Sequence, residues 1–407
     1  MTAIVTAAAQ DFLEALAEEL AISDTRYEQA ETSYESLGTW LNRPASQIAT
    51  FDPAVYVQGS FGLGTVIKPL HEDEEYDVDA VCELKNLDKG DLSQADLKEL
   101  LRVELEAYRT ARSIEKPLEE KRRCWTLRYA DGAQFHMDVV PAITDGDTMR
   151  LILEASHQDS RWADTAIAIT DTDRVDYRIL THDWPHSNPK GYVQWFKAQM
   201  APVLAKRKKE LAEAAQASVE SIPDYRVRTS LQSAIMILKR HRDIMYVKDE
   251  INACPISIII TTLAAHAYGG EERIADALVS ILTGMDSFIL RDAEGRAFIA
   301  NPTDPRENFA DKWVKHPERE EAFYTWLAQA QRDFQAAAEL ADRQLIRETL
   351  EDHLGSDLAK RAEARSAGRK PGGGLLRPAA AAVATAAPAL PAFGDVPRTP
   401  STPKGFA

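Results

Sequence analysis

The chain has 407 residues, 44% of them hydrophobic, and a formal net charge of −16. That length supports two domains or one large bilobal unit, and the acidic balance argues against a protein that coats nucleic acid, because such binding depends on neutralising phosphates. Three scattered cysteines indicate neither a disulfide framework nor a zinc site. The N-terminus lacks the basic segment of a secretory signal, and the longest apolar run, 256–267, is too short to cross a bilayer. We therefore expect a reducing, cytoplasmic setting.

The first part of the chain has two helical patterns within residues 5–41. Apolar residues recur at helical spacing on both sides of a break at Ser23 and Asp24. We expect residues 1–48 to form helices that brace the next domain, with their aromatic side chains packed in a core.

A β-prone run at residues 55–57 leads directly into Gln58, Gly59 and Ser60. A glycine-serine turn after a strand lets backbone N–H groups and a hydroxyl approach a phosphate closely. Taken alone this signal is weak, since many turns contain these residues.

Asp77 and Asp79 alternate with Val78 on the next expected strand, so both carboxylates point to one face. Two charges about 4 Å apart repel by roughly 4 kcal/mol at an effective dielectric near 20, and a divalent cation would remove that penalty. An acidic surface loop running into an edge strand is the plainer alternative. The acidic segment 71–76 could shape a lid or hold an ion of its own.

A hairpin is expected at residues 124–142, with its turn at Asp131-Gly132. On the returning strand Asp138 shares a face with Gln134, His136 and Val140, and an acid on such a strand needs a partner. A helix lies between these strands, in residues 91–111. Together these elements predict an α+β catalytic lobe around a mixed sheet at residues 49–185, in which the polar segment 156–184 loops around or covers the site.

Residues 186–366 read as a second, helical lobe. After a turn at 188–191 comes an aromatic helix, for which packing between lobes and base stacking are both open. A helix at 229–245 carries a basic cluster at 239–242, which in most proteins would be solvated. An apolar core helix follows at 256–268, and further helices run from 318 to about 365.

The composition changes at residue 367. The segment 367–407 holds seven of the chain's 20 prolines and one acid, Asp395. Such a segment cannot bury enough apolar surface to order itself, and we expect a disordered tail.

The order of Gly-Ser, Asp-x-Asp and a third Asp on a later strand resembles the polymerase-β-like nucleotidyltransferases. The segments SNPKGYVQWF, from Ser187, and NPTDPRENFADKW, from Asn301, further resemble the bacterial CD-NTases, relatives of cyclic GMP-AMP synthase and oligoadenylate synthase in CBASS anti-phage defence. The likeness covers most of residues 1–350. It implies a bilobal α+β fold, with a polymerase-β-like nucleotidyltransferase lobe and an oligoadenylate-synthase-like helical lobe.

The resemblance also implies a set of site residues. Two Mg²⁺ ions, or Mn²⁺, would be held by Asp77, Asp79 and Asp138. The phosphates of ATP or another NTP would be contacted by Gln58, Gly59, Ser60, Lys239 and Ser257, the last two acting as a pair.

The implied activity is synthesis of a cyclic di- or trinucleotide that acts through a downstream effector, without a membrane or a stable nucleic-acid partner. A linear tailing enzyme, a protein-adenylylating enzyme and an inactive nucleotide-binding scaffold acting through its tail are the alternatives. The end of the chain, Gly405-Phe406-Ala407, looks like that of relatives whose C-terminal carboxylate is ligated to targets by an E1/E2-like partner. A plain linker end is the competing interpretation.

Overall fold

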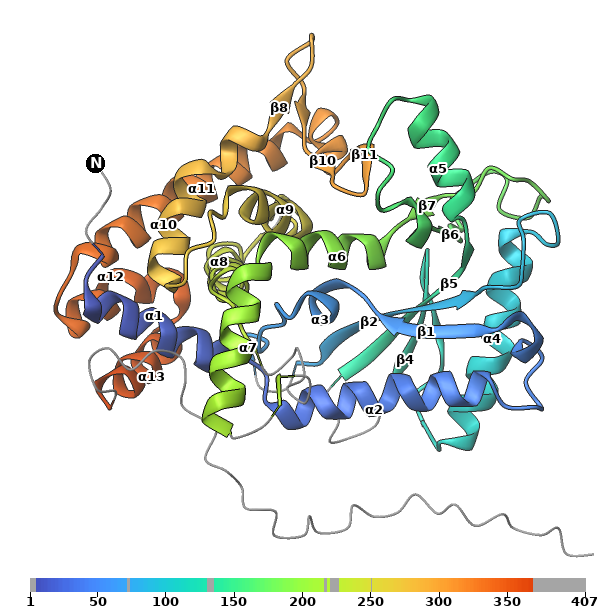
Figure 1. The fold of residues 1–407 in the computed structure, drawn as a ribbon, viewed down its shortest axis with the longest axis horizontal. Helices are drawn as coiled ribbons and strands as arrows, with labels where there is room; N and C mark the ends of the chain where they lie inside the picture. Colours follow the sequence, from blue (N-terminus) through green and yellow to red (C-terminus); the bar gives the residue numbers. More distant parts are fainter. Residues whose placement is uncertain are drawn as a thin grey trace, which may run out of the picture.

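The computed structural model describes residues 5–71, 74–129, 135–215, 218–219, 227–249 and 251–368. Two lobes lie side by side, a sheet with helices and an all-helical part (Figure 1), which confirms the expected bilobal α+β fold. None of the described helices is both long and apolar enough for a transmembrane segment. The expected turn at Asp131-Gly132, residue Gln134 and the tail ending at Ala407 lie outside the described residues.

The first lobe is built on a seven-stranded sheet in the order β1-β2-β5-β4-β3, with β6 paired to β5 and β7 to β6. The strands of this sheet are β1 Pro53–Val57, β2 Tyr76–Leu84, β3 Glu119–Glu120, β4 Trp125–Arg128, β5 Phe135–Thr144, β6 Ile167–Ile169 and β7 His186–Ser187. Four short strands form two hairpins in the second lobe, β8 Leu290–Arg291 with β9 Ala297–Phe298, and β10 Ala300–Asn301 with β11 Asp304–Asn308.

The helices of the sheet lobe and its border are α2 Asp24–Leu41, α3 Gly59–Leu63, α4 Gln94–Ala111, α5 Gly146–Ala155, α6 Pro189–Gln199 and α7 Ala201–Ala215. The helices of the second lobe are α1 Ala7–Leu20, α8 Ser230–Met245, α9 Ser257–Ala267, α10 Ile274–Gly284, α11 Pro317–Glu339, α12 Arg343–Leu354 and α13 Ser356–Ala367.

The two faces of the sheet differ in chemistry because side chains alternate along β2 and β5. Val78, Ala80 and Cys82 pack with Met137 and Val139 into a core shared with α2 and α4. The residues between them, including the acids, point to the opposite face. The parallel pairing of β2 with β5 therefore places the polar side chains of both strands next to each other on that face.

The segment 156–184 corrects the expectation of a loop, because it contains β6. Three apolar residues, Ile167–Ile169, pair antiparallel with the second half of β5, and Ile167 and Ile169 pack with Val81 and Ala142. A strand of three residues is too short to show a clear alternation of apolar and polar residues, and the residues around it are mostly polar.

α8 is the central helix of the second lobe, packed against α1, α9, α10, α11 and α12. Every residue from Ser230 to Arg242 is buried. The basic cluster at 239–242 is therefore not solvated, unlike most mid-helix cations.

The helices expected in residues 1–48 to brace the catalytic lobe pack against different lobes. α2 packs under β1 and against α4, whereas α1 packs between α8 and α13 (Figure 1). The reason is the apolar stripe of α1, where Phe12, Leu16 and Leu20 enter the core of the helical lobe.

Candidate active site

The structure brings the three predicted acids to one place on the sheet. In the parallel register Asp79 lies beside Asp138, and Asp77 lies beside His136. The side chain of Asp77 is 71% exposed and that of Asp138 18%, so the group opens from the sheet towards solvent.

The electrostatics of this group are unfavourable for a protein without a cation. Burial, together with the nearby charges of Asp77 and Asp138, raises the pKa of Asp79 to about 6. The pKa of Asp77 is instead lowered, mainly by its hydrogen bond from His136, whose Nε2 lies 2.6 Å from Asp77 Oδ1. His136 thus stabilises the charged form of Asp77, whereas burial and the neighbouring acids destabilise the charged form of Asp79.

The glycine-serine turn faces these acids. The backbone N–H of Gln58 donates to the carbonyl of Asp79 over 2.8 Å, and Gly59 begins the short helix α3 with φ +56°. A Cβ on Gly59 would lie 2.3 Å from Asp79 Oδ2. Only glycine therefore fits at this position, and the first turn of α3, with Ser60, lies next to the carboxylates.

The segment that follows this turn, residues 63–69, we call the strap. Three side chains of α8 donate to its carbonyl oxygens: Gln232 Nε2 to Leu63 over 2.9 Å, Lys239 Nζ to Thr65 over 3.0 Å, and Arg240 to Lys68 and Pro69. At its other end the N–H of Lys68 donates to the carbonyl of Leu20 in α1 over 2.8 Å. The helical lobe thus holds the segment next to the turn.

Lys239 and Ser257, predicted as a pair, have different hydrogen-bond partners. Ser257 Oγ accepts from Arg242 Nη1 over 2.9 Å, whereas Lys239 donates to the strap. Burial and then the charge of Arg242 lower the pKa of Lys239 to about 8, while Asp79 acts in the opposite direction. Arg242, rather than Lys239, is therefore the side chain of α8 that contacts Ser257. α9 begins at Ser257, two residues after Pro255.

Three residues of the site were not singled out from the sequence. Lys121 Nζ lies 3.1 Å and 3.3 Å from the two carboxylate oxygens of Asp138, and Thr126 Oγ1 donates to Asp138 Oδ1 over 2.5 Å. His136 holds Asp77. Strand alternation could have assigned His136 a role beside Asp77, but Lys121 depends on the path of the chain between β3 and β4.

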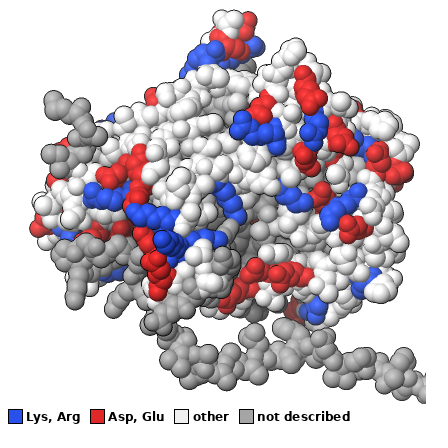
Figure 2. All heavy atoms as spheres, in the orientation of Figure 1, with Lys and Arg blue, Asp and Glu red and all other residues white. Residues whose placement is uncertain are grey.

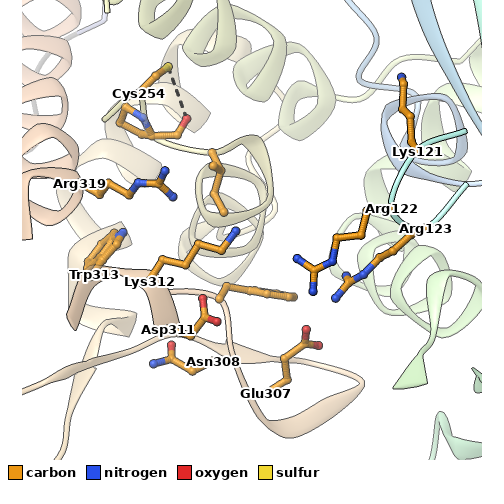
Figure 3. Close-up of a pocket in the computed structure, with 13 residues that line it drawn as sticks. Lys121, Arg122, Arg123, Cys254, Glu307, Asn308, Asp311, Lys312, Trp313 and Arg319 are labelled. Carbon is orange, nitrogen blue, oxygen red and sulfur yellow. Dashed lines mark hydrogen bonds between the residues drawn. The ribbon is translucent and has the colours of Figure 1, made fainter. Parts of the chain in front are cut away.

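A cavity of about 690 Å³ separates the lobes beside this group. Figure 3 shows Lys121, Arg122 and Arg123 on one side and Lys312, Arg319 and Trp313 on the other. Glu307 and Asp311 also line it. A cavity with this excess of cations suits a polyanionic ligand.

The aromatic residues of α6 do not line this cavity. Tyr192, Trp195 and Phe196 are 8%, 7% and 0% exposed and lie in the core of the helical lobe, and the hydroxyl of Tyr192 bonds to Thr262 over 2.7 Å. Packing rather than base stacking is their role here.

Elsewhere the surface is mixed in charge. On the face in Figure 2, cations gather over α7 and acids follow α2, with both signs interspersed between them. Residues 72–73 lie outside the described residues, but Glu75 in the same acidic segment is paired with Arg128 and Lys116, at 2.8 Å and 3.0 Å.

The donor set of the three acids fits hard divalent cations. Mg²⁺ and Mn²⁺ prefer carboxylate oxygens, and burial together with the charges of Asp77 and Asp138 raises the pKa of Asp79, so a cation bound there would stabilise its charged form. Asp77, Asp79 and Asp138 lie on one face of the sheet and are the residues that could hold such a cation.

Comparison with known proteins agrees with this geometry. Residues 53–141 match the family model described as cyclic GMP-AMP synthase DncV-like, nucleotidyltransferase domain. A c-di-GMP synthase of Roseivirga ehrenbergii is 31% identical over 329 residues, covering 80% of this chain and 78% of the relative. A cyclic dinucleotide synthase, CdnG, of Bradyrhizobium diazoefficiens is 26% identical, covering 93% of this chain and 92% of the relative.

Solved structures show the same fold. The structure of the Bradyrhizobium diazoefficiens CD-NTase CdnG in complex with GTP has a TM-score of 0.64 at 23% identity, covering 87% of this chain and 98% of that one. The DncV cyclic AMP-GMP synthase of Vibrio cholerae has a TM-score of 0.55 at 13% identity, covering 84% and 94%.

Proposed function

Because this chain belongs to the CD-NTase family of nucleotidyltransferases, we propose that it joins two ribonucleoside triphosphates and closes them into a cyclic dinucleotide. The observation that carries the proposal is the placement of Asp79 beside Asp138, facing the turn at Gly59. The names of the two relatives favour a cyclic dinucleotide over a trinucleotide or a linear tail, and GTP is the first substrate to test.

Asp77, Asp79 and Asp138 would hold two Mg²⁺ ions. When bound, such ions lower the pKa of the attacking hydroxyl and stabilise the charge on the leaving pyrophosphate. His136 orients Asp77 through its 2.6 Å contact, and Thr126 fixes one oxygen of Asp138. Lys121, now paired with Asp138, adds a cation near the acceptor hydroxyl.

The turn and α8 would bind the triphosphate. The first turn of α3 offers backbone N–H groups and the Ser60 hydroxyl beside the acids, and Lys239 and Arg242 supply buried positive charge from α8. Ser257, held by Arg242, would complete this group. The cavity lined by Arg123 and Lys312 is where the acceptor nucleotide would lie.

The test is the double variant Asp77→Asn with Asp79→Asn, assayed with Mg²⁺ and labelled GTP alone and mixed with ATP. We expect a folded protein without pyrophosphate release or product, whereas the matched surface variant Asp352→Asn with Asp357→Asn keeps full activity. Wild-type product should resist phosphatase, as a cyclic molecule does. Activity that survives loss of both acids would refute the mechanism, and a phosphatase-sensitive product would indicate linear tailing.

Two partners belong to the proposal as well. We propose an effector that binds the cyclic product in anti-phage defence, and an E1/E2-like ligase that acts on Ala407. The second rests on the likeness of Gly405-Phe406-Ala407 to ligated relatives. Mass spectrometry of the chain expressed with and without such a ligase would detect a conjugate at the C-terminus, and unmodified chains in both samples would contradict it.

A further inference from the structure

A second group of metal-ligand side chains lies away from the three acids, inside the helical lobe. It consists of His241 on α8, Asp333 on α11 and His353 on α12. One ligand atom from each lies within 4.8 Å of the others. His241 Nε2 is 3.0 Å and His353 Nδ1 is 2.8 Å from the same oxygen, Asp333 Oδ2.

From this geometry we propose that His241, Asp333 and His353 bind one divalent transition-metal ion, with Zn²⁺ as the best fit. The inference goes beyond the proposed function, which needs only hard cations at the acids of the sheet. Two histidines and a carboxylate are a common ligand set for such metals, and three protein ligands leave a fourth position for water.

The distances suit tetrahedral coordination. Ligand atoms that bind Zn²⁺ at about 2.0–2.1 Å in a tetrahedron lie roughly 3.3 Å apart. The observed 2.8 Å and 3.0 Å need to open by only a few tenths of an ångström. The third separation, between the ligand atoms of the two histidines, is within 4.8 Å.

The surroundings hold the ligands in position. Gln329 Nε2 donates to the other carboxylate oxygen, Asp333 Oδ1, over 2.7 Å, which orients Oδ2 towards the imidazoles. Trp326 and Phe334 form apolar walls around His241. The side chain of His241 is fully buried whereas that of His353 is 29% exposed, so an ion could enter, and a water could bind, from the side of α12.

A metal ion at this site would join α8, α11 and α12 close to Lys239, which is proposed to bind the triphosphate. His241 lies two positions after Lys239 on α8, and its ligand partners come from the helices packed against α8. A bound ion would therefore fix the part of α8 that holds the strap.

The test uses the full chain, stripped of metal with a chelator and kept in excess Mg²⁺ so that the acids of the sheet are occupied. Zn²⁺ is titrated against a chromogenic chelator, and Co²⁺ is added separately to record its visible spectrum. We expect one equivalent of Zn²⁺ per chain, a tetrahedral Co²⁺ spectrum, and a melting temperature that rises with Zn²⁺.

Asp333→Asn and His353→Gln should each weaken Zn²⁺ binding at least tenfold, while His157→Ala, an exposed histidine, should bind as the wild type does. Equal Zn²⁺ binding by the wild type and both ligand variants would overturn the proposal. Should the variants fail to fold, the wild-type spectrum still decides, because an octahedral Co²⁺ spectrum alone would also overturn it.

Discussion

Asp79 lies in an environment that disfavours its charge. Its neighbours Asp77 and Asp138 are both acids, and Gly59 packs against its carboxylate. The folded pKa of about 6 exceeds the ordinary 3.8, so the folded chain binds a proton more tightly than the unfolded chain does. The resulting penalty is fully present above pH 6 and disappears as the pH falls towards 4.

Asp79→Asn should therefore stabilise the metal-free protein while it abolishes catalysis. At pH 8 we expect a gain of about 2 kcal/mol, after discounting the pKa shift for solvent, and a gain near zero at pH 4. Thermal melts in chelator at several pH values measure this. The control is Asp352→Asn on the surface of α12. An unchanged or lower melting temperature at pH 8 would contradict the prediction.

Gly59→Ala tests the close approach of the turn to the acids. The new Cβ would meet Asp79 Oδ2, and the positive φ adds strain of about 1 kcal/mol. We expect turnover to fall at least tenfold. Gly270→Ala is the matched control, because its φ is +89° with no atom within 4 Å of the new Cβ. It should lose similar stability yet keep its activity, and equal activity losses would refute the contact argument.

The sequence was sufficient to place the three acids and the turn. Alternation along two strands fixes the face of Asp77, Asp79 and Asp138, and only the relative register of the strands had to be supplied by the fold. Lys121 could not be found in the same way. Its contact with Asp138 depends on where the chain crosses from β3 to β4, which no local pattern encodes.

Among the elements, α8 departs most from its apparent pattern. Its cluster 239–242 reads as a solvated face, yet every member is buried, because the strap and the neighbouring helices supply partners. Helix limits were predictable from caps and spacing, as with the break at Ser23, which caps α2. The placement of α1 in the helical lobe and the short strand β6 were not, since both depend on distant packing partners.

Lys239→Met should separate the binding role of α8 from its structural role. Lys239 is held by one carbonyl and lies within electrostatic reach of Asp79. Its replacement by an apolar side chain of similar length should cost less than about 1 kcal/mol of stability and raise KM for GTP at least tenfold.

Arg240→Met is the comparison, because Arg240 also donates to the strap, but to carbonyls farther along it, those of Lys68 and Pro69. It should lower the melting temperature more than Lys239→Met does and raise KM less. Steady-state kinetics and thermal melts of both variants decide between these patterns, and the reverse ranking would contradict the assigned roles.

At the scale of the whole molecule, residues 5–368 contain both cores and all proposed catalytic and nucleotide-binding residues. Deleting residues 369–407 should therefore change kcat of the isolated enzyme by less than about twofold and its melting temperature by no more than a few degrees. Conjugation by an E1/E2-like ligase should be lost. The two assays are run on the same preparations, and a large fall in kcat would show that the tail takes part in catalysis.

Substrate should stabilise the molecule as a unit, since both lobes line the cavity. At 100 times its dissociation constant, GTP with Mg²⁺ should add about 2.7 kcal/mol. The Asp77→Asn, Asp79→Asn protein should show a much smaller thermal shift. An equal shift in this variant would mean that the nucleotide binds elsewhere.

The strap connects the two lobes, so it restricts how they can move relative to each other. Its backbone continues from α3 of the sheet lobe, but its carbonyls are bonded to α8 and its amide at Lys68 to α1. Any hinge motion that widens the cavity must therefore either break these bonds or carry the glycine-serine turn along with the helical lobe. In the second case, opening the cleft would itself pull the turn away from the carboxylates, so that product release and disassembly of the phosphate site would be one event.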